Sequence, residues 1–239
     1  QVKEYSKLSG LLTDARYNGN IDWDAIEDRV RIPNIPSTFK DVNHLIKIAR
    51  DSYQLDRWKN QKYHVEIWTE KDAISSVIQP LTNEYQVTLC VNRGYSSASA
   101  MFESARRLRS KVVKECEEWN GRTCIILYLG DYDPSGLDMV RDIRERISEF
   151  TEMSDFKIIP IALTREQINQ YKPPPNPAKI KDPRAKWFIE NYGNTSWEVD
   201  ALRPEVLQKL IEKSILEYLD LEKFELVKKK ELDDKKSIK

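Results

Sequence analysis

Residues 123–136 read TCIILYLGDYDPSG, an apolar run that stops at a glycine and is followed by two aspartates, a proline and a second glycine. A short continuous run of this kind, rich in β-branched and aromatic residues, is typical of a strand buried on both faces. The residues that follow favour a tight turn and the start of a helix. We therefore predict a strand over Thr123–Gly130 and a helix over about 136–150.

The same alternation of short apolar runs and longer amphipathic segments continues on both sides of this stretch. It predicts further strands at His64–Thr69, Gln86–Val91 and Lys157–Ala162, with helices at about 71–83 and 97–119 between them. Each connection is longer than the roughly 10–12 residues that a parallel crossover needs. The sequence therefore predicts an α/β fold with a mainly parallel four-stranded sheet flanked by helices.

Two helical patterns precede the predicted sheet. Residues 4–18 place an apolar face on one side of a helix that ends near Gly19, and a short apolar segment follows before Arg29 and Arg31. This order of a helix, a glycine and a short ribbon resembles the second half of a winged helix-turn-helix. The alternative is that the helix only packs on the next domain. Residues 38–59 predict a second helix, with these side chains facing inward: Phe39, Val42, Leu45, Ile46, Ala49 and Tyr53.

The residues after the predicted sheet change character twice. Residues 171–183 carry five of the eleven prolines, so we predict no regular element there. Residues 204–219 form an amphipathic pattern typical of a helix, and the polar tail from Lys228 is expected to fray. The predicted divisions are a partial winged helix (1–36), a linker helix (37–61), the sheet domain (62–170), an extension packed on it (171–227) and a charged tail (228–239).

Composition excludes several classes of protein. The 239 residues carry 39 basic and 39 acidic side chains, so a strongly basic nucleic-acid binder is excluded and any such role must rest on local patches. The three cysteines form no CxxC pair, which argues against a zinc site and favours reduced thiols. No apolar stretch reaches the roughly 18 residues of a membrane span, and no signal peptide opens the chain. We expect a soluble cytoplasmic protein without membrane contact.

Acidic residues follow two of the predicted strands. Glu70 comes directly after the first strand, and Asp131 and Asp133 follow the third. Open α/β sheets place ligands at the carboxyl ends of their strands, and parallel neighbours would bring the three carboxylates together. Such an oxygen-only set suits Mg²⁺ or Mn²⁺, which can orient a phosphate and stabilise charge on its oxygens. The alternative for the two aspartates is an acidic turn that binds no metal.

These residues carry a resemblance to a known family. The glutamate after the first strand and the DxD after the third resemble the motifs of the Toprim domain. The stretches Glu70-Lys71-Asp72-Ala73 and Asp131-Tyr132-Asp133-Pro134-Ser135-Gly136 are most similar to the A subunit of type IIB topoisomerases (topoisomerase VI) and its meiotic double-strand-break relatives. The segment Val91-Asn92-Arg93-Gly94-Tyr95 resembles the Gly-Tyr turn of that family. The resemblance covers roughly residues 62–165.

The resemblance implies a function, a cofactor and partners. Glu70, Asp131 and Asp133 would be the catalytic residues and Mg²⁺ ligands, Asp131 directly and Asp133 through water, with Glu70 also a general acid or base. The implied activity is Mg²⁺-dependent DNA binding and strand breakage by a nucleoid-associated homodimer with an ATPase partner subunit. Tyr5 is not assigned as the nucleophile, so either a tyrosine upstream of Gln1 attacks the DNA or an activated water does, as in a Toprim nuclease. A third alternative is a catalytically silent DNA-binding or assembly module.

Basic residues near the predicted centre are candidates for contact with DNA phosphates. They are Lys71, Arg93, Arg107, Lys111 and Lys114, the last three spaced along one face of the helix at 97–119. The alternative for that helix is a solvated face with intrahelical ion pairs. Glu198 and Asp200 share a face in an extended segment, which indicates either a second acidic shell near the metal or a solvent-facing edge. Both histidines, His44 and His64, are expected to be structural.

Overall fold

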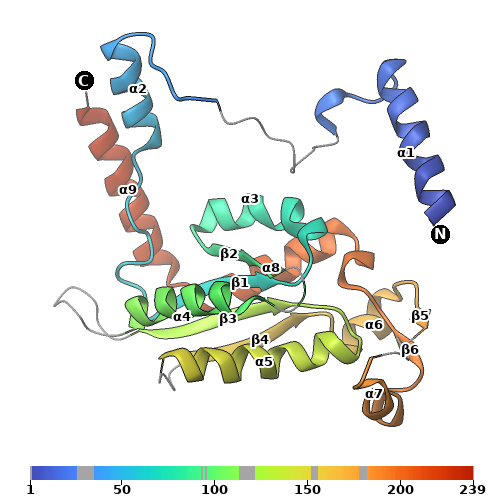
Figure 1. Ribbon diagram of the computed structural model, residues 1–239. Helices are drawn as coiled ribbons and strands as arrows, with labels where there is room; N and C mark the ends of the chain where they lie inside the picture. Colours follow the sequence, from blue (N-terminus) through green and yellow to red (C-terminus); the bar gives the residue numbers. More distant parts are fainter. Residues whose placement is uncertain are drawn as a thin grey trace. The chain divides into compact units, whose positions relative to one another are not determined.

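The computed structural model describes residues 2–25, 35–92, 94, 96–112, 122–151, 156–177 and 182–238 (Figure 1). The chain divides into two compact units, residues 1–49 and 50–239. Among the helices of the described residues, none combines the length and hydrophobicity that crossing a membrane requires.

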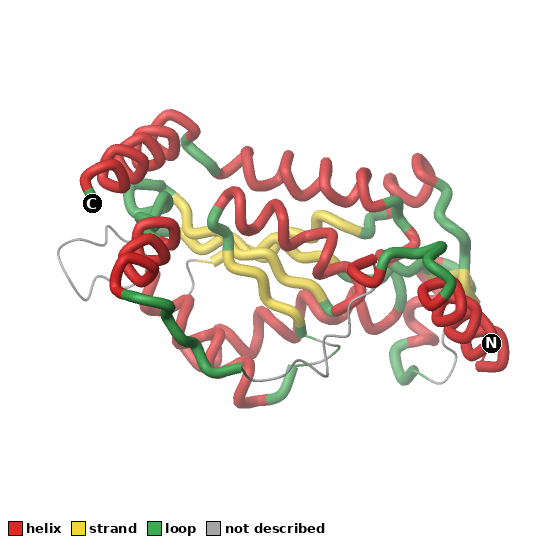
Figure 2. Tube along the Cα trace, turned by 90° about the horizontal axis from the view of Figure 1, so that it is seen from above, coloured by secondary structure: helices red, strands yellow, loops and turns green. Residues whose placement is uncertain are grey.

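The second unit is built on a four-stranded parallel sheet. Its strands are β1 (Tyr63–Thr69), β2 (Thr88–Val91), β3 (Thr123–Leu129) and β4 (Phe156–Ala162), in the order β2-β1-β3-β4. They run side by side in Figure 2. The predicted α/β class and the four strands are confirmed. Because β1 and β3 are central and their side chains are buried on both faces, these two strands read as almost continuous apolar runs.

Helices cover both faces of this sheet (Figure 1). On one face, Ile125, Leu127 and Leu129 of β3 share a core with α3 (Ser75–Tyr85) and α8 (Pro204–Tyr218). On the other face, Ile126 and Tyr128 share a core with α4 (Ala98–Val112) and α5 (Pro134–Thr151). Alternate residues of a strand point to opposite faces, so β3 contributes to both cores. The result is a three-layer α/β/α arrangement.

A series of short elements connects β4 to α8. They are α6 (Arg165–Tyr171), β5 (Asn176–Pro177), α7 (Ala185–Tyr192), β6 (Thr195–Ser196) and the 3₁₀ turn η3 (Val199–Ala201). β5 and β6 form a two-residue antiparallel pair, so the prediction of no regular element over 171–183 is wrong at Asn176 and Pro177. Beyond β6, Trp197 forms an antiparallel bridge with Tyr132. Through this bridge, the segment between β4 and α8 lies against the residues that follow β3.

The predicted fraying of the tail from Lys228 is wrong, because α9 extends over Leu221–Ser237. Asp220 caps its start by accepting a hydrogen bond from the Lys223 amide. Glu231 is buried in this helix and accepts hydrogen bonds from the Leu55 amide and Arg57 Nη2, both at 3.0 Å. Packing against residues 55–57, which lie far away in the sequence, therefore stabilises a helix whose composition alone suggested disorder.

Replacing Glu231 by glutamine is expected to lower the free energy of unfolding by about 2 kcal/mol, because hydrogen bonds to charged groups contribute roughly 1.5–3 kcal/mol. The matched control is Glu225→Gln on the same helix, whose ion pair with Lys228 is exposed and should contribute less than about 1 kcal/mol. Chemical denaturation of both variants measures the difference. Equal stabilities would show that α9 is not held through Glu231.

The first unit contains α1 (Val2–Tyr17), the 3₁₀ turn η1 (Trp23–Ala25) and most of α2 (Val42–Ser52). The predicted first helix is confirmed, with Leu8 and Leu11 exposed on it. The second is shorter than predicted and has no buried residue, so the expected inward face of Phe39, Val42 and Leu45 is wrong. The other residues expected inward are not buried either: Ile46, Ala49 and Tyr53. The ribbon of the partial winged helix was expected from Ile21 onward; Trp23–Ala25 form a 3₁₀ turn there, and residues 26–34 lie outside the described residues.

Candidate functional site

The register of the two central strands brings Glu70 and Asp131 together. Thr69 at the end of β1 lies beside Leu129 at the end of β3, so the next residues of both strands leave the sheet at the same edge. The amide of Asp131 donates a hydrogen bond of 2.9 Å to Glu70 Oε1. The structure therefore places these two carboxylates as the parallel strands predicted, whereas their catalytic role stays a prediction.

Asp133 has a structural role that its spacing from Asp131 did not indicate. Its Oδ1 accepts hydrogen bonds from the Gly136 amide at 2.7 Å and from Ser135 Oγ at 3.0 Å. It is thus the N-cap of α5, with Pro134 in the first helical position, where proline is favoured. The charge of Asp133 nevertheless acts on Glu70, so all three predicted carboxylates belong to one acidic centre.

Lys71 lies inside this acidic centre. Its Nζ is 3.2 Å from Asp131 Oδ1, 2.8 Å from Glu198 Oε2 and 2.8 Å from Asp200 Oδ1. Glu198 and Asp200 arrive through the bridge between Tyr132 and Trp197, and the Val199 amide between them donates a hydrogen bond of 2.8 Å to Asp131 Oδ1. Glu198 precedes the 3₁₀ turn η3 and Asp200 lies within it, so the two are not on an extended edge. Both approach the centre through Lys71, whereas their place around a metal stays a prediction. The predicted phosphate ligand Lys71 is bound to carboxylates.

Burial and mutual repulsion shift the pKa values of these carboxyl groups. Burial raises the pKa of Glu70 to about 7, and the charges of Asp131 and Asp133 add to this effect, against the hydrogen bond from the Asp131 amide. Burial also raises the pKa of Asp131, although the Val199 amide and Lys71 favour its charged form. Glu70 therefore changes its charge near neutral pH, as expected where negative charge is in excess.

The chemistry of the donor set fits a hard divalent cation. All candidate ligand atoms are carboxylate oxygens, which Mg²⁺ and Mn²⁺ prefer, and a divalent ion would relieve the repulsion that raises the pKa of Glu70. In the described part of the chain, however, no group of three His, Cys, Asp or Glu side chains is arranged to hold a metal ion. The carboxylates are bound to amides and to Lys71 instead.

Arg107 is bound by a buried carboxylate that its helical spacing did not indicate. Its Nε and Nη2 donate hydrogen bonds of 3.0 and 2.9 Å to the two oxygens of Glu66, a fully buried residue in the middle of β1. Trp68 Nε1 donates to the same carboxylate at 2.9 Å, and His64 Nε2 at 3.1 Å. The guanidinium of Arg107 is thus used inside the protein, which does not support the predicted phosphate contact. The signal that was missed is a glutamate within an apolar strand.

Of the other predicted basic contacts, only Lys111 lies in the described part of the chain. Lys111 lies in the last turn of α4. Burial raises the pKa of the Cys124 thiol to about 12, and the charge of Lys111 acts against this effect. Cys124 is at the start of β3. The carboxylates lie at the opposite end of that strand. Arg93 and Lys114 are outside the described residues. Beside the centre, the Asn92 amide donates to the Thr69 carbonyl and the Gly94 amide donates to the Glu70 carbonyl.

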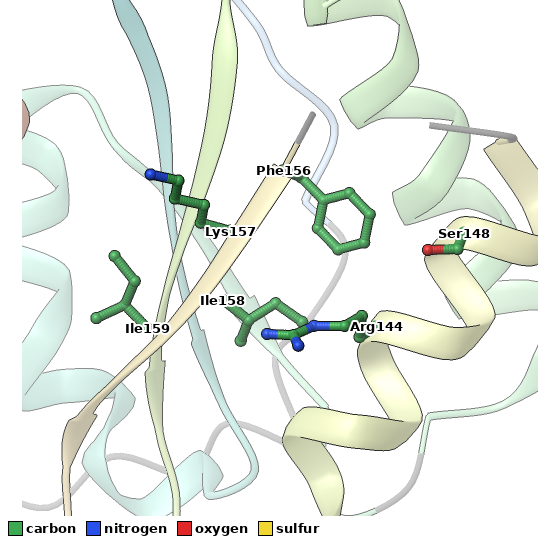
Figure 3. Close-up of a pocket in the computed structure, with 6 residues that line it drawn as sticks. All are labelled: Arg144, Ser148, Phe156, Lys157, Ile158 and Ile159. Carbon is green, nitrogen blue, oxygen red and sulfur yellow. The ribbon is translucent and has the colours of Figure 1, made fainter. Parts of the chain in front are cut away.

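A cavity of about 500 Å³ lies between β4 and α5, away from the acidic centre. Figure 3 shows its six lining residues, with Phe156 directed toward α5 and Lys157 away from it. Phe156 pairs with Cys124 at the start of β3, so the cavity is near the amino ends of the strands. It is therefore separate from the carboxylates that follow the strands.

The candidate site consists of Glu70, Asp131 and Asp133, surrounded by Lys71, Glu198 and Asp200. Neither a protein-family model nor a curated protein matches this chain.

Proposed function

We propose that this chain binds DNA and breaks its strands in an Mg²⁺-dependent reaction, as a Toprim protein resembling the A subunit of type IIB topoisomerases. The observation that carries the proposal is that Glu70 and Asp131 meet beyond the adjacent parallel strands β1 and β3, with Asp133 two residues further along the chain at the start of α5. The four-stranded parallel sheet with helices on both faces is of the fold class that the resemblance implies. A homodimer, an ATPase partner and a nucleoid location belong to the same proposal.

The proposed roles follow from the chemistry of each side chain. Glu70 and Asp131 would hold Mg²⁺ directly, and Asp133, already an N-cap, would bind it through water. When bound, Mg²⁺ would neutralise a phosphate and stabilise charge on the leaving oxygen. Glu70, which lies beside Asp131, would also serve as the general acid or base at the scissile phosphate, the second role that the resemblance implies for it.

Replacing Asp131 by asparagine is expected to lower DNA cleavage roughly 100-fold or more. The variant loses a carboxylate that would hold Mg²⁺, and with it the positive charge that stabilises the reacting phosphate. Asparagine keeps the acceptor oxygen for the Val199 amide, so the fold should be retained. The assay is nicking or linearisation of supercoiled DNA with Mg²⁺ and with EDTA. The matched control is Asp142→Asn on α5, whose carboxylate pairs with Arg146, and it should cleave like the wild type.

The form of the cleaved end separates the chemical alternatives. A tyrosine nucleophile leaves protein attached to the DNA after denaturation, whereas an activated water leaves a free end. Denaturing electrophoresis with and without protease distinguishes these products. Absence of Mg²⁺-dependent cleavage together with intact DNA binding would favour the silent binding module, and equal cleavage by wild type and Asp131→Asn would exclude the proposed centre.

A further inference from the structure

Lys71 places a positive charge among the carboxylates that would bind a cation. Its ammonium group lies within 3.2 Å of oxygens from Asp131, Glu198 and Asp200, and its side chain is only 18% exposed. Asp131 is a proposed metal ligand, whereas Glu198 and Asp200 lie on the connection beyond β6 and are more exposed. Lys71 is therefore shared between the metal centre and a second pair of carboxylates.

The ammonium of Lys71, 3.2 Å from Asp131 Oδ1, weakens the binding of a divalent cation to the same carboxylate, because like charges repel. Glu198 and Asp200 each lie closer to the lysine than Asp131 does. A shift of the ammonium toward this pair would release Asp131 while keeping the lysine charge compensated. The flexible four-carbon stem of lysine permits such a shift without movement of the backbone.

We propose that Lys71 is the resident counter-ion of the acidic centre, which competes with the divalent cation for Asp131, and that Glu198 and Asp200 are positioning residues that receive Lys71 when the cation binds. This inference rests on the proposed function, since it requires Asp131 to be a metal ligand. It assigns to Lys71 a role in controlling metal occupancy in place of a phosphate contact. Because coupling is reciprocal, the cation weakens the contact of Lys71 with Asp131 by the factor by which Lys71 weakens cation binding.

The experiment measures Mn²⁺ affinity by isothermal calorimetry on the full chain, without DNA and without an activity assay. Lys71→Met removes the charge and keeps much of the stem, and we expect it to bind Mn²⁺ about tenfold more tightly than the wild type. Lys71→Gln provides a second neutral variant, and Lys71→Arg, which keeps the charge, should bind no more tightly than the wild type. Thermal unfolding confirms that each variant is folded.

The receiving role of the carboxylate pair is tested by a mutant cycle. The double variant Glu198→Gln/Asp200→Asn leaves Asp131 as the carboxylate contact of Lys71, so Mn²⁺ binding should weaken several-fold. Adding Lys71→Met to this double variant should restore the affinity of Lys71→Met alone, because the pair acts through the lysine. Weak binding in the triple variant would show instead that Glu198 and Asp200 are themselves ligands and would overturn their positioning role.

The outcomes separate this inference from the proposed function. If the wild type binds Mn²⁺ and Lys71→Met and Lys71→Gln bind it equally or more weakly, the counter-ion role is wrong and the metal centre stands. If neither the wild type nor any variant binds Mn²⁺, the proposed metal centre is wrong and the counter-ion role fails with it. The inference is supported if Lys71→Met and Lys71→Gln both bind Mn²⁺ more tightly than the wild type and Lys71→Arg does not.

Discussion

Replacing Arg107 by alanine is expected to lower the free energy of unfolding by about 3–5 kcal/mol, the range seen when one partner of a buried ion pair is removed. Glu66 is fully buried and receives two hydrogen bonds from the guanidinium of Arg107. Without them its carboxylate would remain in the core with Trp68, His64 and the Cys90 thiol as partners and no guanidinium to balance its charge. The loss of stability therefore comes mainly from an uncompensated buried charge.

The pH dependence of stability provides an independent test of the same pair. Burial alone raises the pKa of Glu66, but hydrogen bonds from His64 and Arg107 outweigh burial and lower the pKa to about 2 from its ordinary value of 4.5. Because the pKa is depressed in the fold, this stabilisation is present above about pH 4.5 and is lost as the pH falls toward 2. It amounts to about 3 kcal/mol, and we expect the acid-dependent loss to be smaller in Arg107→Ala.

Arg106 supplies the matched control on the same helix. Its guanidinium pairs with Glu103 one turn earlier, and both side chains are mostly exposed. Arg106→Ala should therefore change stability by less than about 1 kcal/mol. Urea denaturation of both variants between pH 7 and pH 2 makes the comparison. If Arg107→Ala is as stable as Arg106→Ala but binds DNA more weakly, Arg107 contacts phosphate and the buried pair is unimportant.

The central sheet could be predicted from sequence because its strands are buried on both faces. β1 and β3 are apolar over most of their length, and the parallel order then placed Glu70 beside Asp131. Glu66 was overlooked because it is a single charged residue within an otherwise apolar strand. Its carboxylate binds Arg107, and not the neighbouring arginines of α4. Helical spacing identifies side chains that share a face, but not the partner that this face meets.

Two further features depend on contacts between distant parts of the chain. Glu198 reaches the acidic centre because Trp197 pairs with Tyr132, and no local pattern distinguishes this pairing from a solvent-facing edge. Similarly, α9 has the composition of a disordered tail, yet Glu231 binds residues 55–57. Local propensity is a weak guide where tertiary contacts supply most of the stability.

Replacing Gly136 by alanine is expected to have a large effect on both stability and the acidic centre. A Cβ atom at this position would lie 2.1 Å from the carbonyl oxygen of Asp131, a backbone atom that no side-chain rotation can move away. The first turn of α5 would have to separate from the end of β3. We expect a loss of roughly 3 kcal/mol or more in the free energy of unfolding, at or above the upper range for overpacking.

The same substitution should disturb the centre beyond its effect on folding, because Asp131 would be displaced from the Val199 amide and from Lys71. A displacement of about 1 Å can lower a reaction rate about 100-fold, so Mn²⁺ affinity and DNA cleavage should both fall in the fraction of Gly136→Ala that remains folded at low temperature. Gly10→Ala is the matched control: a Cβ there meets nothing within 4 Å, and in the helix α1 it should leave stability unchanged or raise it by up to about 1 kcal/mol. Wild-type stability and Mn²⁺ affinity in Gly136→Ala would mean that α5 does not begin against Asp131, and the geometry from which the metal centre is inferred would then be incorrect.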